Sequence, residues 1–300
     1  PGGPDICSDD GTGALPIMKA SYYPGCSLEG TAKPYDHSTR AVCDALGIVL
    51  ADIPDWSCCG SSPALKMNKG LSTALAAHNL ALSETQDAAD VVVPCPFCFR
   101  RLRSAQAELA ADPDLKARVE SAVESPVAGT TTIHSLLGYL RDRVGAEAIR
   151  ERVRRPLTGL TVAPYYGCYL VKPPAVTGVD DPETPTAMDT ILTDLGATVI
   201  DWDFKTECCG AGLAVSKTET VRALCGRIVR EAAYQGADAL VVACQLCQAN
   251  LDMRQGDARL PVLYFTQLLC LAFGLSPSAL GLKHHLVSPM KLLSAKGLSR

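Results

Sequence analysis

The chain has 300 residues, 47% of them hydrophobic and 20% charged, a composition typical of folded globular proteins. At about 150 residues per domain, this length favours two domains. The net charge is −4 and no dense Lys/Arg run is present, which argues against nucleic acid as a partner. The longest apolar stretches, such as Pro261–Leu275, are shorter than the roughly 20 residues of a transmembrane helix, so no direct membrane span is expected.

The N-terminal segment, residues 1–17, is rich in proline, glycine and polar residues and lacks the basic and apolar regions of a secretory signal peptide. We expect a disordered or vector-derived arm here, and we assign no role to its Cys7. The chain contains 14 cysteines but is long and apolar enough to build a core without disulfides. We therefore expect reduced cysteines and a cytoplasmic protein.

Ten of the cysteines form two copies of one pattern, offset by about 145 residues. The first copy has Cys26, Cys58-Cys59-Gly60 and Cys95-x-x-Cys98, and the second has Cys168, Cys208-Cys209-Gly210 and Cys244-x-x-Cys247. The flanking residues also repeat, since YYPGC at Tyr22–Cys26 corresponds to YYGC at Tyr165–Cys168. The pattern indicates a duplication, with a first domain over 18–157 and a second domain, including a C-terminal docking tail, over 158–300.

The same predicted elements surround both copies. Before each CCG triplet, a helix ending at a glycine precedes a short apolar strand: Pro34–Leu46 with Ile48–Ile53, and Thr184–Leu195 with Thr198–Trp202. After each triplet, a longer helix leads to a buried strand and then the CxxC motif: Gly70–Ala89 with Val91–Val93, and Thr218–Gln235 with Ala239–Val242. This alternation predicts an α/β fold of two tandem domains, each a small, mainly parallel sheet flanked by helices, with the site beyond the strand ends. We expect Arg141–Leu157 to join the domains and Lys172–Glu183 to form a surface loop.

The cysteine chemistry points to a metal centre. A CxxC motif at a helix N-terminus favours thiolates, because backbone N–H groups and the helix dipole stabilise negative charge there. Neighbouring side chains of a vicinal pair diverge, so the pair suits different atoms of a cluster better than one tetrahedral ion. An all-sulfur ligand set selects iron–sulfur or zinc, and five thiolates exceed zinc's four. Structural zinc remains the alternative, and the run typical of cubane ferredoxin clusters is absent from the sequence.

The pattern C…CCG…CxxC, present twice, resembles the cysteine-rich CCG domain family and, within it, the B subunits of heterodisulfide reductases. The resemblance also covers CQLCQAN at Cys244–Asn250 and PVLYFTQ at Pro261–Gln267. It implies an iron–sulfur catalytic subunit that reductively splits, or forms, a disulfide at two noncubane [4Fe-4S] clusters located at the domain interface. The ligands it implies are Cys26, Cys58, Cys59, Cys95, Cys98, Cys168, Cys208, Cys209, Cys244 and Cys247.

The resemblance also implies partners: a C-type cubane iron–sulfur subunit, an A-type flavin subunit, and a small-molecule or protein-carried disulfide that serves as substrate. Two alternatives stay open. Related CCG chains relay electrons between a succinate-, lactate- or glycolate-type dehydrogenase and a quinone-linked partner, and this chain could do the same. The second alternative is a zinc-stabilised interaction module.

Beyond the cluster ligands, no catalytic residue is predicted with equal support. His37 and His78 flank the first motif and are secondary candidates for supplying protons to two product thiolates. We expect His134 to occupy a structural position in a helix and the tail at His284-His285 to dock onto the fold or a partner. Three further cysteines are predicted to be small core residues, namely Cys43, Cys225 and Cys270.

Overall fold

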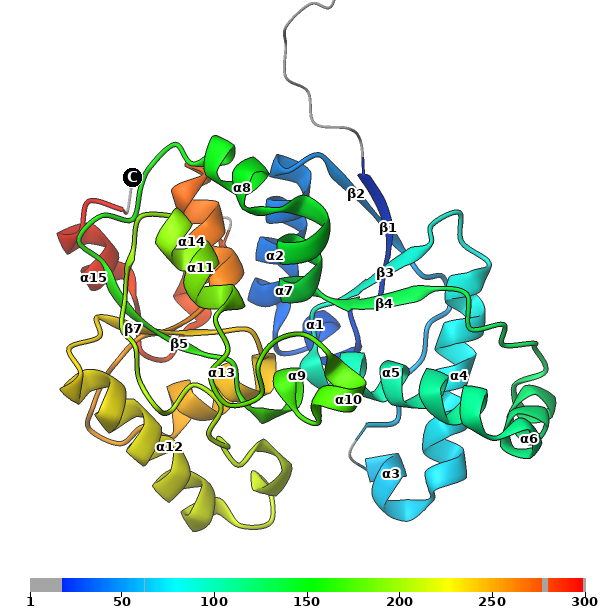
Figure 1. Cartoon of the computed structure of the whole chain (residues 1–300). Coiled ribbons are helices and arrows are strands. Elements are labelled where there is room, and N and C mark those ends of the chain that lie inside the picture. The colour runs from blue at the N-terminus through cyan, green and yellow to red at the C-terminus, as the bar shows by residue number, and fades with distance from the viewer. Residues whose placement is uncertain (1–17, 62, 277–279, 299–300) are drawn as a thin grey trace, which may run out of the picture.

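The computed structural model describes residues 18–61, 63–276 and 280–298 (Figure 1). The predicted N-terminal arm, with Cys7, lies outside these residues. Two four-stranded sheets form the framework, and every strand pair in them is parallel. The first sheet has the order β2-β1-β3-β4 and consists of β1 (Met18–Tyr22), β2 (Ile48–Asp52), β3 (Asp90–Val93) and β4 (Thr132–Ser135). The second has the order β6-β5-β7-β8 and consists of β5 (Thr161–Tyr165), β6 (Thr198–Val199), β7 (Ala239–Val242) and β8 (Val262–Tyr264).

The central strands are the apolar runs that the sequence pattern indicates. Val91–Val93 of β3 and all four residues of β7 are at most 1% exposed. Such continuous burial is typical of parallel strands covered by helices on both faces. Because both sheets have the same strand order, the structure confirms the predicted α/β fold of two repeated units.

The helices of the first half are α1 (Cys26–Glu29), α2 (Lys33–Ala45), α3 (Pro63–Met67), α4 (Lys69–Glu84), α5 (Pro96–Ala111), α6 (Pro113–Val123), α7 (Leu136–Tyr139), a π-helical turn (Leu140–Val144) and α8 (Ala146–Arg152). Local signals start several of them. The Asn68 side chain accepts from the Leu71 N–H to cap α4, and Asp112 caps α6 in the same way. Proline in the first turn, where no intrahelical N–H bond is lost, opens α2, α5 and α6.

The helices of the second half are α9 (Cys168–Val171), α10 (Pro174–Thr177), α11 (Ala187–Asp194), α12 (Thr218–Tyr234), α13 (Gln245–Met253), α14 (Phe265–Ala272) and α15 (Met290–Ala295), with short 3-10 turns at Ala211–Leu213 and Leu282–His284. Within the described ranges, none of the helices combines the length and the hydrophobicity needed to cross a lipid bilayer.

Some elements are shorter than predicted, for local reasons. α11 begins at Ala187 instead of Thr184, because the carboxylates of Asp180 and Asp181 accept hydrogen bonds from the backbone N–H groups of the preceding turn. The predicted strand Thr198–Trp202 pairs only at its first two residues. The chain then turns so that the Lys205 carbonyl can accept from two backbone N–H groups beside the second cysteine motif.

Two predicted connections contain more structure than the sequence indicated. Arg141–Leu157 is more than a charged link, because it contains α8 and fully buries Ile149 and Leu157. Lys172–Glu183 is not a plain surface loop, because it contains α10 and contacts the first half of the chain. There the Arg103 Nε donates to the Val176 carbonyl at 3.2 Å. Both segments therefore belong to the contact between the two halves.

The two sheets share a buried interface built from α2 and α14, which lie side by side in Figure 1. The hydroxyls of Ser38 and Thr266 are 2.7 Å apart, and the Tyr35 and Tyr264 rings stack with their centroids 4.4 Å apart. The predicted core cysteines are buried as expected, with Cys43, Cys225 and Cys270 at most 1% exposed. This interface fixes the two cysteine motifs relative to each other.

Candidate metal centre

Parallel strands bring the cysteines of each copy to one sheet edge. In the first half, Cys26 opens α1 just after β1, the vicinal pair Cys58-Cys59 follows β2, and Cys95 follows β3 as the cap of α5. The second half repeats this order after β5, β6 and β7. Because the carboxyl ends of parallel strands meet at the same edge, segments far apart in sequence converge there.

Three cysteines of the first copy, Cys59, Cys95 and Cys98, lie in contact with one another. The Sγ atoms of Cys59 and Cys98 are 3.3 Å apart, and the Cys98 N–H donates to the Cys95 Sγ at 3.4 Å. Cys26 and Cys58 are exposed, whereas the other three are buried. The copy therefore presents two thiols at the surface and three inside.

The second copy repeats this arrangement around one cavity. The Sγ atoms of Cys209 and Cys247 are 3.4 Å apart, and the Gly210 N–H donates to the Cys208 Sγ at 3.3 Å. All five cysteines of this copy line the cavity, together with residues that include Phe97 from the first half. The cavity has a volume of about 30 Å³. The structure thus brings together the five predicted residues of the second copy.

One glycine in each copy lets the backbone pass close to a buried thiol. Gly25 has φ +73° and Gly167 has φ +69°, which L-residues with side chains rarely adopt. A Cβ atom on Gly25 would lie 2.9 Å from the Cys98 Sγ, and one on Gly167 would lie 3.1 Å from the Cys247 Sγ. Any side chain at either position would therefore occupy space beside the thiols.

A tyrosine near each of these glycines ties the vicinal pair to the strand. The Tyr23 hydroxyl donates to the Ser57 carbonyl at 2.6 Å, and the Tyr165 hydroxyl donates to the Glu207 carbonyl at 2.5 Å. Ser57 and Glu207 immediately precede the vicinal cysteines. Tyr23 therefore corresponds to Tyr165, so the YY pairs are offset by one residue, because Pro24 occupies the place of Tyr166.

Hydrogen bonds between thiols split their pKa values. Hydrogen bonds from Cys58 and Cys98 lower the pKa of Cys59 to about 4, and one from Cys168 lowers the pKa of Cys208 to about 6. The pKa of Cys98 is raised by its bond to Cys59, and the pKa of Cys247 by its bond to Cys209. Contacts between thiols thus move the pKa values of neighbouring cysteines apart, and metal binding would release the protons that these thiols carry.

The chemistry of the cysteines indicates which metal group they would suit. Among the described residues, no group of three or more His, Cys, Asp or Glu side chains is arranged so that it could hold a metal ion. Each copy nevertheless offers five sulfurs, with a backbone held close to them by glycine. Soft thiolates of this kind are typical ligands of iron–sulfur clusters.

The two secondary histidine candidates lie on helices beside the first copy. His37 is exposed on α2. His78, on α4, lines a separate cavity of about 430 Å³ together with Ser57 and Val123. These positions do not test whether either histidine donates protons, so that role stays a prediction.

The other two predicted histidine roles have different outcomes. His134 lies in strand β4 and not in a helix, so that prediction is wrong; its ring bonds to Asp90 at 2.9 Å, which holds it at the sheet edge. His285 docks the tail onto the fold as predicted. It is buried, and its ring nitrogens lie 3.1 Å from the Gln248 Nε2 and 3.0 Å from the Gln267 Nε2.

Sequence reasoning missed two polar residues that contact the cysteines. The Gln245 Nε2 donates to the Cys95 Sγ at 2.8 Å. The Asn250 Nδ2 donates to the Cys209 carbonyl at 3.2 Å and lies 3.8 Å from its Sγ. Both residues belong to CQLCQAN. The signal that could have identified them is the presence of polar side chains on a helix that directly follows a buried strand.

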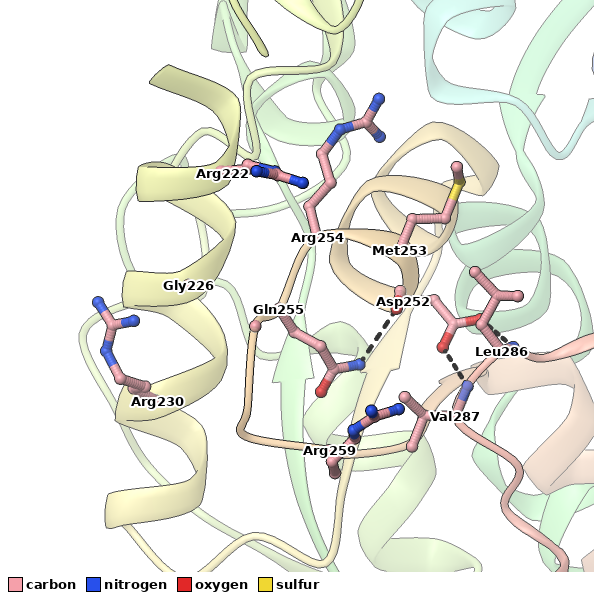
Figure 2. A pocket seen from close by; sticks show the side chains of 11 residues that line it. Arg222, Gly226, Arg230, Asp252, Met253, Arg254, Gln255, Arg259, Leu286 and Val287 are labelled. Carbon is pink, nitrogen blue, oxygen red and sulfur yellow. Dashed lines mark hydrogen bonds between the residues drawn. The ribbon is translucent and has the colours of Figure 1, made fainter. Parts of the chain in front are cut away.

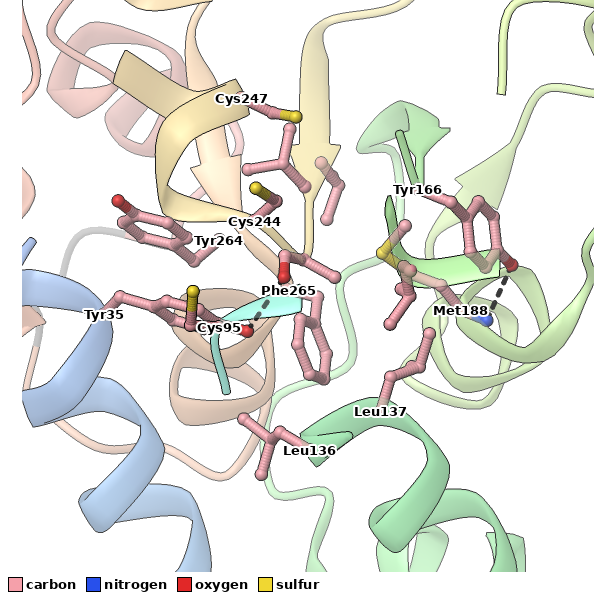
Figure 3. Close-up of a cluster of buried hydrophobic side chains, with 14 of the residues drawn as sticks. Tyr35, Cys95, Leu136, Leu137, Tyr166, Met188, Cys244, Cys247, Tyr264 and Phe265 are labelled. Carbon is pink, nitrogen blue, oxygen red and sulfur yellow. Dashed lines mark hydrogen bonds between the residues drawn. The ribbon is translucent and has the colours of Figure 1, made fainter. Parts of the chain in front are cut away.

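The two halves also meet beside the cysteines, as Figure 3 shows for Cys95 and Cys244 in the same buried cluster as Tyr35 and Tyr264. The Tyr35 hydroxyl donates to the Ala243 carbonyl at 3.2 Å. Close by, the rings of Phe97 and Tyr169 stack across the halves with centroids 3.9 Å apart. The cysteine motifs therefore face a common aromatic interface.

Comparisons with known proteins agree with this geometry. A profile of the cysteine-rich domain CCG matches residues 20–103 and 162–252. The chain is 34% identical over 283 residues to the 8-methylmenaquinol:fumarate reductase membrane anchor subunit of Wolinella succinogenes, covering 91% of this chain and 98% of the relative. It is 32% identical over 295 residues to the B subunit of the ferredoxin:CoB-CoM heterodisulfide reductase of Methanosarcina mazei, covering 93% and 97%.

Among solved structures, a hypothetical protein from Helicobacter pylori superposes with a TM-score of 0.70 at 13% identity, covering 91% of this chain and 53% of the other. This likeness concerns the fold alone, and the present chain spans about half of that protein. The two profile matches, in contrast, contain all ten patterned cysteines. The chain therefore belongs to the cysteine-rich CCG domain family, with the B subunits of heterodisulfide reductases among its relatives.

Proposed function

We propose that the chain is the iron–sulfur catalytic subunit of a heterodisulfide-reductase-like complex, which splits or forms a disulfide at two noncubane [4Fe-4S] clusters. The observation that carries the proposal is the cavity lined by all five cysteines of the second copy, whose motif the first copy repeats. The relatives named as reductase subunits support an iron–sulfur subunit of an oxidoreductase complex. The proposed ligands are the ten cysteines of the two motifs, five for each cluster.

The reaction is RSSR′ + 2 e⁻ + 2 H⁺ → RSH + R′SH, so it needs two electrons and two places for sulfur. When bound, two clusters would each supply one electron and one thiophilic iron site. The chain's own residues hold the two ligand sets against a shared interface. Phe97 and Tyr169 stack there, while the exposed side chains of Cys26 and Cys58 leave the first site open toward the surface.

The proposal extends to assembly and location. We propose two partner subunits as electron donors, one holding cubane iron–sulfur clusters and one holding flavin, because the relatives are themselves named as subunits of reductases. We also propose a cytoplasmic location, because ten ligand thiols must stay reduced until they bind metal. The domain boundaries that accompany this function are 18–157 and 158–300, each with one sheet and one ligand set.

A second candidate function is electron relay. It is favoured by the relative that is 34% identical and named as a subunit of a fumarate reductase. In a relay, the same cysteines would hold clusters, but a disulfide would not react there. Electrons would pass from a dehydrogenase partner to a quinone-linked one.

The first experiment is metal and sulfide analysis of anaerobically purified protein. Two clusters correspond to about eight iron atoms per chain, whereas zinc without iron would overturn the proposal. Electron paramagnetic resonance of the oxidised protein should differ from that of a cubane ferredoxin. Turnover of a low-molecular-weight disulfide by the reduced protein alone then separates cleavage from relay.

A further inference from the structure

A basic pocket lies at the far end of α13 from the cysteine motif. It has a volume of about 620 Å³, and α12 and the segment after α13 form its walls (Figure 2). Four arginines line it: Arg222, Arg230, Arg254 and Arg259. Four like charges around one opening on a chain with net charge −4 form a strong local contrast.

Three acidic groups in or beside the lining offset part of the charge of the four arginines. Asp252, the one acidic residue in the lining, accepts from the Leu286 N–H at 2.7 Å and the Val287 N–H at 3.0 Å. Outside the lining, Glu219 lies 3.6 Å from the Arg222 guanidinium, and Asp257 occupies the same turn as Arg259. The carboxylate in the pocket is thus already engaged by backbone donors.

Two of the guanidinium groups have free donors. Arg254 donates to the Asn250 side chain at 2.7 Å. In the part of the chain that the structure describes, Arg230 and Arg259 form no ion pair or side-chain hydrogen bond. Arg259 also has φ +50°, an uncommon backbone conformation for a residue with a long side chain.

The polar and apolar side chains that line the pocket beside the arginines indicate which kind of anion fits. The Gln255 side chain is occupied by the backbone of its own segment, with its Nε2 3.0 Å from the Leu260 carbonyl and its Oε1 2.6 Å from the Leu260 N–H. Apolar side chains border the arginines, and Met253 is 59% and Leu286 66% exposed. Exposed arginines beside exposed apolar side chains are typical of protein interfaces. A small-molecule site would instead place fixed polar groups on its floor.

We propose that this basic pocket docks an acidic segment of a partner polypeptide, with carboxylates paired to Arg230 and Arg259 and an apolar side chain against Met253 and Leu286. Guanidinium groups pair with carboxylates through two parallel hydrogen bonds, which fixes position as well as charge. The inference rests on the proposed function in one respect, namely that the chain works beside partner subunits.

The test uses the full-length chain and a fluorescent eight-residue peptide of glutamates with one central leucine, followed by fluorescence anisotropy. We expect saturable binding that weakens about tenfold in the double variant Arg230→Gln/Arg259→Gln, since each exposed guanidinium–carboxylate pair contributes about a factor of three. Binding should also weaken when ionic strength rises from about 0.1 M to about 1 M. The matched double variant Arg118→Gln/Arg152→Gln, which removes equal charge elsewhere, should bind like the parent.

Three outcomes would overturn the proposal: absence of saturable binding, equal losses in the two double variants, or ATP binding more tightly than the peptide and depending on the same arginines. The last would assign the pocket to a small anion. Thermal melting of each variant establishes that it is folded. Iron content is measured on the same samples, so failure of peptide binding in protein that holds clusters leaves the proposed function standing.

Discussion

The Gln245 Nε2 lies 2.8 Å from the Cys95 Sγ, although the two residues are 150 positions apart and follow strands of different sheets. Gln245 is 2% exposed, and its Oε1 has no hydrogen-bond partner within the described residues. The corresponding residue of the first copy is Pro96, whose side chain has no polar group to donate a hydrogen bond. A residue of the second copy therefore donates to a cysteine of the first, and the residue at the matching position of the first copy cannot do the same. This makes the two ligand sets unequal.

Replacing Gln245 should change the reduction potential of one proposed cluster more than it changes stability. A hydrogen bond to a ligand sulfur stabilises the more negative, reduced state of a cluster. Gln245→Leu should therefore make the reduction potential of the first cluster more negative by tens of millivolts. A shift of this size is on the order of one thermal energy unit per electron. Stability should change by less than about 1 kcal/mol, because the variant also removes an unpartnered buried oxygen.

A redox titration monitored by electron paramagnetic resonance measures the shift. Asn250→Leu serves as the matched control, because Asn250 contacts Cys209 of the second copy. A potential shift confined to the second cluster in Gln245→Leu would contradict the ligand assignment.

Adding one methyl group beside Cys98 should remove metal from the first copy. In Gly25→Ala the new Cβ would lie 2.9 Å from the Cys98 Sγ, so that thiol must move away from its position. With ψ 162°, the positive φ lies in a region that is essentially restricted to glycine, which adds about 1–3 kcal/mol of backbone strain. We expect about half of the iron to be lost, measured as iron per chain after anaerobic purification.

The matched control for this experiment is Gly145→Ala. Gly145 has φ 83° and ψ 159°, close to the φ 73° and ψ 162° of Gly25, and its added Cβ would meet no atom within 4 Å. The control therefore carries a similar backbone strain without the contact to sulfur. Equal iron loss in both variants would show that strain, and not crowding of the ligand, is responsible.

The free energy of unfolding should fall below neutral pH, because His285 in the C-terminal tail is buried in its neutral form. Burial lowers the pKa of His285, because the charged imidazolium is disfavoured there. The unfolded chain, with a histidine pKa near about 6.5, then binds more protons than the folded chain. Stability from this residue is complete above about pH 6.5 and is lost as the pH falls toward the folded pKa.

Denaturant unfolding at about pH 7.5 and about pH 5.5 measures this effect, expected to reach up to about 1 kcal/mol. His285→Gln should reduce the difference between the two pH values. His284→Gln is the control, because His284 is the exposed neighbour. If His285→Gln kept the full pH dependence, another group would be responsible.

Local patterns predicted the fold because they reflect local physics. Short β-branched runs such as Val91–Val93 favour buried strands, and a glycine with positive φ ends the helix before β2 and before β6. The cysteine positions follow, since each motif comes directly after a strand of a parallel sheet. These relationships depend on residues that are close in sequence.

Contacts between distant segments could not be read in the same way. Nothing near Gln245 in the sequence indicates Cys95, and nothing near Arg230 indicates the turn at Arg259. The correspondence of Tyr23 with Tyr165 likewise depends on a distant contact, because it is shown by the carbonyl groups that the two hydroxyls bind. From the letters YY alone, Tyr22 aligns equally well with Tyr165. The packing of α10 on the first half was missed for this reason, because proline and glycine in Lys172–Glu183 report only on local conformation.

Cleavage of a disulfide should require both cysteine copies, because one cluster provides one electron and one site for sulfur whereas the S–S bond needs two of each. We expect Cys208→Ser/Cys209→Ser to keep the cluster of the first copy and to accept electrons there, while release of two thiols falls to background. Cys58→Ser/Cys59→Ser should give the mirror result.

Cys270→Ser is the control: it should lower stability by about 1 kcal/mol through burial of a hydroxyl and leave iron content and turnover unchanged. Thiol release from a small disulfide, assayed beside electron transfer from partner to acceptor, distinguishes the two functions. In a relay with one cluster off the path, one of the two double variants would keep nearly full electron transfer, and such an asymmetric result would rule out cleavage by two clusters.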